Sequence, residues 1–170
     1  MGRNQPAKFV TPMDLISAES EEEKSLLVRF ASDAEDFITG FSWCRGVQEK
    51  YLGNGVGGIV GVFLFHIVPQ SPKVDEWLWV IVGDIPPAYL VLDKAKTPSA
   101  ALKSYIDEMF RWISAVEAGR PTGDLIPVDV SPTAEHASML RRRLNMLRNE
   151  LLPRFRQDEA AARSGNDHAD

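Results

Sequence analysis

The fold is decided by three apolar runs that follow one another closely: Gly57–Val68 (GGIVGVFLFHIV), Glu76–Val82 (EWLWVIV) and Ala88–Leu92 (AYLVL). Each run is rich in β-branched and aromatic residues and is bounded by Gly, Pro, Asp or Ser, which is typical of strands. The links are too short for crossover helices, so we expect antiparallel strands. Apolar side chains occupy both alternating faces of the first run, which predicts a sheet that is covered on both sides.

One helix is predicted before the sheet. Ser20 and Glu23 form a capping box at its start, and Gly40 is the predicted stop. The segment Phe41–Leu52 fits either a short helix or an edge strand. We favour a fourth strand that pairs with the first apolar run through a turn at Gly53–Gly55, because Asn and Gly tolerate the positive φ angles of tight turns.

Two helices are predicted after the sheet. Thr97-Pro98 provides a cap and a first-turn proline for one of them, and Gly119 ends it. Ser131-Pro132 repeats the device for the final helix, which Pro153 is predicted to stop. The sequence therefore predicts an α+β fold: a three- or four-stranded antiparallel meander sheet packed by one N-terminal and two C-terminal helices.

The length of 170 residues favours a single domain. We predict that this domain spans residues 1–156, with an irregular arm at residues 1–18. Residues 157–170 are polar and carry no apolar stripe, so a disordered tail is predicted there.

Composition favours a cytoplasmic protein. No apolar run reaches the roughly 18 residues of a membrane span, and the N-terminus lacks the apolar core of a secretory signal. Cys44 is the single cysteine, so no internal disulfide can form, which fits a reducing compartment.

The net charge of −5 is unevenly distributed. Residues 14–36 carry eight acids against two bases, a balance of −6, whereas residues 133–156 carry six arginines against two acids, a balance of +4. Such polarity can steer a charged partner, and it can equally reflect solvated helix faces that lie near each other.

His66 is the leading candidate for catalysis. With Asp84 or Glu76 beside it, this histidine could act as a general base. Cys44 could serve as its nucleophile, although a lone cysteine is more often a small buried hydrophobe. The three histidines lack the spacing of a zinc motif, and no glycine-rich phosphate loop precedes a helix, so no metal or cofactor is predicted.

Candidate binding residues lie in three places. Asp84 belongs to the rigid turn before Pro86-Pro87, Trp77 and Trp79 lie on a strand, and Arg141 and Arg142 belong to an arginine run. The chain is acidic and interleaves no aromatic residues with these bases, which disfavours nucleic acid as the ligand. Another protein is the expected partner.

The middle of the chain resembles a group of small uncharacterised bacterial proteins. The resemblance is carried by Gly57–Phe65 and Glu76–Val91 and extends through the helix that begins at Thr97, about the middle half of the sequence. It implies a bacterial origin. That group has no assigned activity, so the resemblance implies no site residue.

Two hypotheses about function follow. The first is a non-catalytic protein-binding domain, such as an immunity or inhibitor-type protein that binds a toxin or effector, and it is favoured by the lack of a catalytic motif. The alternative is a small hydrolase-like enzyme that uses His66 with Asp84 or Glu76. The first hypothesis includes a homodimer formed through the two-sided sheet.

Overall fold

The computed structural model describes residues 7–167 of the chain. These residues divide into two compact units that meet in the chain between Ala101 and Leu102. Two segments lie outside the described residues: residues 1–6 of the predicted irregular arm, and residues 168–170 of the tail, which include His168. The single domain that the sequence predicts over residues 1–156 stays a prediction.

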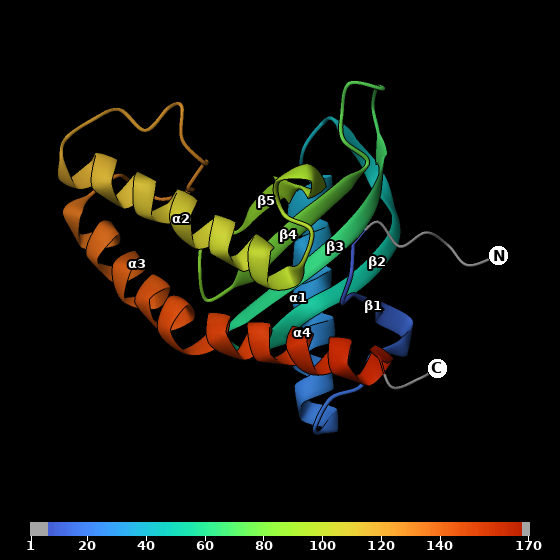
Figure 1. Cartoon of the computed structure of the whole chain (residues 1–170). Helices are drawn as coiled ribbons and strands as arrows, with labels where there is room; N and C mark the ends of the chain where they lie inside the picture. The colour runs from blue at the N-terminus through green and yellow to red at the C-terminus, as the bar shows by residue number, and fades with distance from the viewer. Residues whose placement is uncertain (1–6, 168–170) are drawn as a thin grey trace. The chain divides into compact units, whose positions relative to one another are not determined.

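The N-terminal unit is built on one antiparallel sheet, which confirms the predicted α+β fold (Figure 1). Its strands follow one another in space in the order of the sequence: β1 Thr11–Pro12, β2 Cys44–Val56, β3 Val60–Pro69, β4 Trp77–Gly83 and β5 Ala88–Val91. The sheet has five strands rather than three or four. The extra strand is β1, which lies inside the segment predicted to be irregular. Its two residues pair with Leu52 and Tyr51 of β2.

The segment 41–52 contributes to a strand, as favoured, but the predicted turn at Gly53–Gly55 is wrong. Strand β2 continues through these residues, and the chain reverses at residues 57–59, where Gly58 adopts a φ of +80°. Val56 then pairs with Val60. Only a residue without a Cβ enters this conformation at low cost. The turn is therefore made at Gly57-Gly58 rather than at Gly53–Gly55.

Helix α1, Glu21–Thr39, covers one face of the sheet. Its N-cap is Ser20, whose hydroxyl accepts the Glu23 N–H at 3.1 Å, as the capping-box pattern predicts. The helix has apolar residues at helical spacing, and they meet every second residue of β3 and β4. The shared core contains Ala31, Ala34, Ile38, Phe63, Phe65, Ile67, Leu78, Val80 and Val82.

The other face of the sheet is buried as well, which confirms the prediction of cover on both sides. Val62, Leu64 and Ile81 have no exposed surface. Trp79 is also fully buried, and its indole N–H donates to the Ala95 carbonyl at 2.8 Å. A buried indole needs this partner, because an unpaired N–H in an apolar core is costly.

The second unit begins within helix α2, Pro98–Glu117. Thr97 caps the helix by accepting the Ala100 N–H at 3.2 Å. At the other end Gly119 has a φ of +68°, and the Arg120 N–H donates to the Ala115 carbonyl at 2.8 Å. This is a Schellman ending, and it confirms the predicted stop at Gly119.

Helix α3, Ala134–Met146, runs antiparallel to α2, because Arg141 contacts Glu117 and Arg148 contacts Phe110. Its cap is Thr133 rather than the predicted Ser131: the Thr133 hydroxyl accepts the His136 N–H at 3.2 Å. Apolar residues spaced three and four apart are all buried along α3 and the turn that follows it: Ala137, Leu140, Leu144, Leu147 and Leu151.

Pro153 does not stop the final helix. A π turn, η3 Leu147–Leu151, follows α3, and α4, Leu152–Asp167, continues from it. The wider turn places Pro153 in the first turn of a new helical segment, where its missing N–H costs little. Residues 157–167 are therefore helical where a disordered tail was predicted. Within residues 7–167, no helix is both long and apolar enough to cross a membrane.

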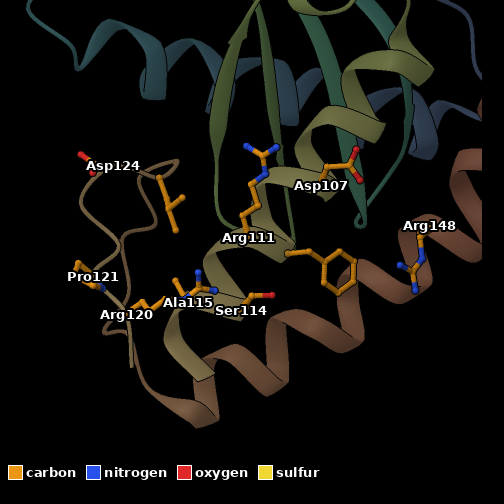
Figure 2. A pocket seen from close by; sticks show the side chains of 10 residues that line it. Asp107, Arg111, Ser114, Ala115, Arg120, Pro121, Asp124 and Arg148 are labelled. Carbon is orange, nitrogen blue, oxygen red and sulfur yellow. The ribbon is translucent and has the colours of Figure 1, made fainter. Parts of the chain in front are cut away.

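The loop after α2 folds back along that helix (Figure 2). The structure shows this segment, residues 118–133, as turns and irregular chain.

Candidate functional site

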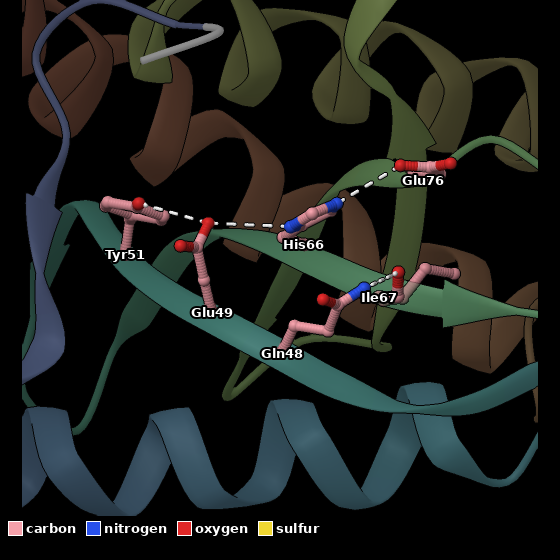
Figure 3. Close-up of polar contacts among 6 residues, drawn as sticks. All are labelled: Gln48, Glu49, Tyr51, His66, Ile67 and Glu76. Atoms are coloured by element: carbon pink, nitrogen blue, oxygen red, sulfur yellow. Dashed lines mark hydrogen bonds and ion pairs between the residues drawn. The ribbon is translucent and has the colours of Figure 1, made fainter. Parts of the chain in front are cut away.

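His66 lies at the centre of a polar cluster that spans three strands. Cross-strand pairing places Glu49 of β2 and Trp77 of β4 directly opposite His66 of β3, on the face away from α1. The ring Nδ1 lies 3.5 Å from Glu49 Oε2, and Nε2 lies 3.2 Å from Glu76 Oε2, at the entry to β4 (Figure 3). Two carboxylates therefore hold the two ring nitrogens.

Aromatic side chains complete this His66 cluster. The imidazole stacks on the Trp77 ring with a centroid separation of 4.3 Å and an interplanar angle of 4°. The Tyr51 hydroxyl donates to Glu49 Oε2 at 3.3 Å, and the Tyr51 side chain is buried. The Glu76 carbonyl accepts the Ile67 N–H at 2.8 Å, which fixes the backbone beside the histidine.

This arrangement suits a structural histidine better than a general base. Carboxylates only accept hydrogen bonds, whereas a neutral imidazole has a single N–H, so only the doubly protonated ring can donate to both Glu49 and Glu76. A general base needs a nitrogen lone pair directed at the proton it removes. In His66 both nitrogens are already engaged with carboxylates.

Asp84 is remote from His66. It follows Gly83, which pairs with Val60, and His66 lies six residues further along β3. At about 3.3 Å per residue this separates the two residues by roughly 20 Å. The Asp84 N–H donates to the Ile59 carbonyl at 3.0 Å, so its backbone forms part of the turn beside Ile59.

Cys44 lies on the opposite side of the sheet from His66, within the core beneath α1. Its thiol lies 3.6 Å from the Gly46 carbonyl. Burial raises the pKa of the Cys44 thiol, and the nearby negative charge of Glu35 raises it further. The structure thus brings Glu76 to His66 and keeps both Asp84 and Cys44 away from it.

The tryptophans and arginines named as binding candidates have different environments. Trp77 is half-buried against His66, whereas Trp79 is fully buried and has no surface to offer a partner. Arg141 pairs with Glu117 at 2.5 Å and lies over the Phe110 ring, 5.9 Å from its centroid. Arg142 is exposed on α3.

A groove of about 690 Å³ opens in the C-terminal unit. One face of α2 forms its floor, the loop after α2 forms one wall, and Arg148 of η3 lies at the other side (Figure 2). We call it the arginine groove. Its lining residues are Asp107, Phe110, Arg111, Ser114, Ala115, Arg120, Pro121, Asp124, Leu125 and Arg148.

Positive charge exceeds negative charge in the arginine groove, since three arginines face two aspartates. Lys103 lies 2.7 Å from Asp107 and compensates its charge. Arg111 pairs with Glu108 at 3.4 Å across an exposed surface, where such pairs contribute little. The groove therefore offers guanidinium groups to an anionic ligand.

The sequence analysis missed most of this groove. Asp107, Arg111 and Ser114 are spaced as one polar face of a helix, and that spacing was a usable signal. The positions of Arg120 and Leu125 depend on how the loop returns to α2, which no local pattern specifies.

No family model, curated protein or solved structure matches the chain. The residues that the structure describes contain no group of three His, Cys, Asp or Glu side chains that could hold a metal ion.

Proposed function

We propose that the chain is a non-catalytic bacterial protein-binding domain that receives its partner in the arginine groove. The observation that carries this proposal is the groove itself, a cavity of about 690 Å³ lined by three arginines and by apolar side chains. Arginine and aromatic residues are enriched at the centres of protein interfaces, where they supply most of the binding energy.

The proposed type is an inhibitor or immunity-type protein that binds a toxin or effector, and the proposed location is the cytoplasm. A protein of this type needs a binding surface and no reaction centre. A free, buried cysteine fits a reducing cytoplasm. A homodimer is the competing form of association, and the experiment below separates it from a foreign partner.

In-cell photocrosslinking tests the proposal. A photoreactive residue is placed at Ser114 inside the groove, and another at the exposed Gln157 of α4 serves as the matched position outside it. The partner recovered from the Ser114 position is then purified, and its binding is measured by calorimetry.

The paired charge variants decide the result. Arg111→Glu with Arg120→Glu removes groove cations, whereas Arg154→Glu with Arg156→Glu changes the net charge equally at exposed sites on α4. We expect the first variant to lose binding by about tenfold or more and the second to keep it. Equal binding by both variants, or an adduct that forms only with a second copy of this chain, contradicts the proposal.

A second candidate function rests on the contact between His66 and Glu76 at 3.2 Å. A hydrolase-like enzyme would use this histidine as a base. Hydrolysis of a panel of ester, amide and phosphoester substrates by the wild-type protein and by His66→Gln separates the two functions. A wild-type rate above background that His66→Gln abolishes would establish the enzyme; we expect both proteins to leave the substrates unchanged.

A further inference from the structure

We infer that the arginine groove binds an acidic peptide segment of the partner protein, with carboxylates on Arg111 and Arg120 and an apolar side chain between them. This inference rests on the proposed function and specifies its ligand. It is carried by the exposure and pairing of the groove arginines, by the apolar part of the lining and by the backbone hydrogen bonds at the start of the loop that forms the wall.

Arg120 is the best-placed cation for a ligand. Within residues 7–167 its guanidinium makes no hydrogen bond or ion pair, and the side chain is exposed on the wall of the groove. Arg111 is 69% exposed and holds Glu108 at 3.4 Å. A carboxylate can accept two parallel hydrogen bonds from one guanidinium, so an incoming acid can compete well with this loose contact.

The backbone of Arg120 is preorganised. Its N–H donates to the Ala115 carbonyl at 2.8 Å, and the Gly119 N–H donates to the Val116 carbonyl at 3.2 Å. A further turn, closed by the Leu125 N–H on the Thr122 carbonyl at 3.1 Å, brings Leu125 into the wall. Backbone that is already held by hydrogen bonds loses less entropy on binding, which favours affinity.

Part of the groove lining is apolar and suits a peptide side chain. Phe110 and Leu125 are both half-buried and line the cavity with Ala115 and Pro121. The Arg148 guanidinium lies over the Phe110 ring, 5.0 Å from its centroid, and the Arg148 side chain also donates to Asn145 at 2.8 Å. A leucine or similar residue on the ligand can occupy this surface between the cations.

An acidic peptide fits the charge pattern better than nucleic acid does. Asp107 and Asp124 interrupt the cations, so a continuous row of phosphates would meet two carboxylates. Acidic side chains on a peptide can be spaced to avoid them. A cavity of about 690 Å³ is also within the usual size range for a ligand site, roughly 300–1,000 Å³.

Fluorescence anisotropy with a labelled peptide of repeated Glu-Glu-Leu units tests the inference on the full chain. Matched peptides replace each Glu by Gln or by Lys, and a single-stranded oligonucleotide and inorganic phosphate are the competitors. We expect the Glu peptide to bind at least about tenfold more tightly than the Gln peptide, and more weakly as salt rises. The Arg111→Glu, Arg120→Glu variant should lose this preference, whereas Arg154→Glu, Arg156→Glu should keep it.

Circular dichroism confirms that both variants fold, which is expected because all four arginines are exposed. Equal binding of the Glu and Gln peptides, or tighter binding of the oligonucleotide, overturns the inference. If the crosslinked cellular partner still depends on the groove in that case, the proposed function stands and only its ligand chemistry is wrong. If no groove-dependent partner is recovered, the proposed function itself fails.

Discussion

Glu23 stabilises two elements of the N-terminal unit. Its N–H donates to the Ser20 cap, and its carboxylate accepts the Gly57 N–H at 2.7 Å. A Cβ on Gly57 would lie 2.8 Å from the Leu26 side chain, so only glycine fits the approach of the hairpin to α1. One side chain thereby links the start of the helix to the end of β2.

Replacing Glu23 by Ala should cost about 1–2 kcal/mol of unfolding free energy, because a partly buried N–H loses a charged acceptor. Glu22→Ala is the matched control, since Glu22 is an exposed acid in the same first turn. Urea denaturation of both variants measures the difference. Equal losses would show that the contact with Gly57 adds nothing beyond the helix dipole.

Cys44 should react slowly with Ellman's reagent in the folded protein. Burial raises the pKa of the thiol, so the reactive thiolate is scarce at pH 8, and the rate should rise with pH. We expect labelling at least about tenfold slower than in urea. Ser42→Cys in a Cys44→Ala background provides an exposed thiol two residues away, and equal rates for the two thiols contradict the account.

Helix boundaries show what local patterns can and cannot predict. The caps at Ser20 and Thr97 and the stop at Gly119 are confirmed, because side-chain caps and glycine endings depend on a few neighbouring residues. Pro153 misled the prediction because a π turn upstream changes where the proline falls in the helix. Nothing in the sequence around Leu147–Leu151 marks that turn.

Pro153→Ala should therefore change the unfolding free energy by less than about 0.5 kcal/mol. Arg156→Pro, at an exposed position three residues later in α4, should cost about 3 kcal/mol, because it removes an interior hydrogen bond and clashes with the preceding turn. Thermal and urea unfolding compare the two. A large loss in Pro153→Ala would mean that the proline stabilises the π turn actively.

Alkaline pH should destabilise the whole molecule through Tyr105. Burial raises the pKa of the Tyr105 phenol far above its ordinary value, so the folded state holds the neutral form. Its contribution to stability is constant below pH 10, near the unfolded pKa, and is lost above it by up to about 1.4 kcal/mol per pH unit. The free energy of unfolding, measured with urea between pH 8 and 11, should fall less steeply with pH for Tyr105→Phe than for the wild-type protein. Identical pH dependence in the two proteins would contradict the role of Tyr105.

Tertiary structure limits how much of the candidate sites the sequence can specify. Alternation in Gly57–Val68 suffices to predict a sheet buried on both faces. The partners of His66 depend on strand register, which places Glu49 and Trp77 opposite it. The arginine groove depends on a loop that returns to α2, so Arg111 and Arg120 have no shared local signal.

The most direct measurement of the central claim is a ¹H–¹⁵N NMR titration of the full chain with the Glu-Glu-Leu peptide. We predict that chemical shifts change at Arg111, Ser114, Arg120 and Leu125 and at the Arg148 side chain, while the amides around His66 keep their positions. Shifts that gather around His66, Glu49 and Glu76, with the groove residues unmoved, would contradict the account.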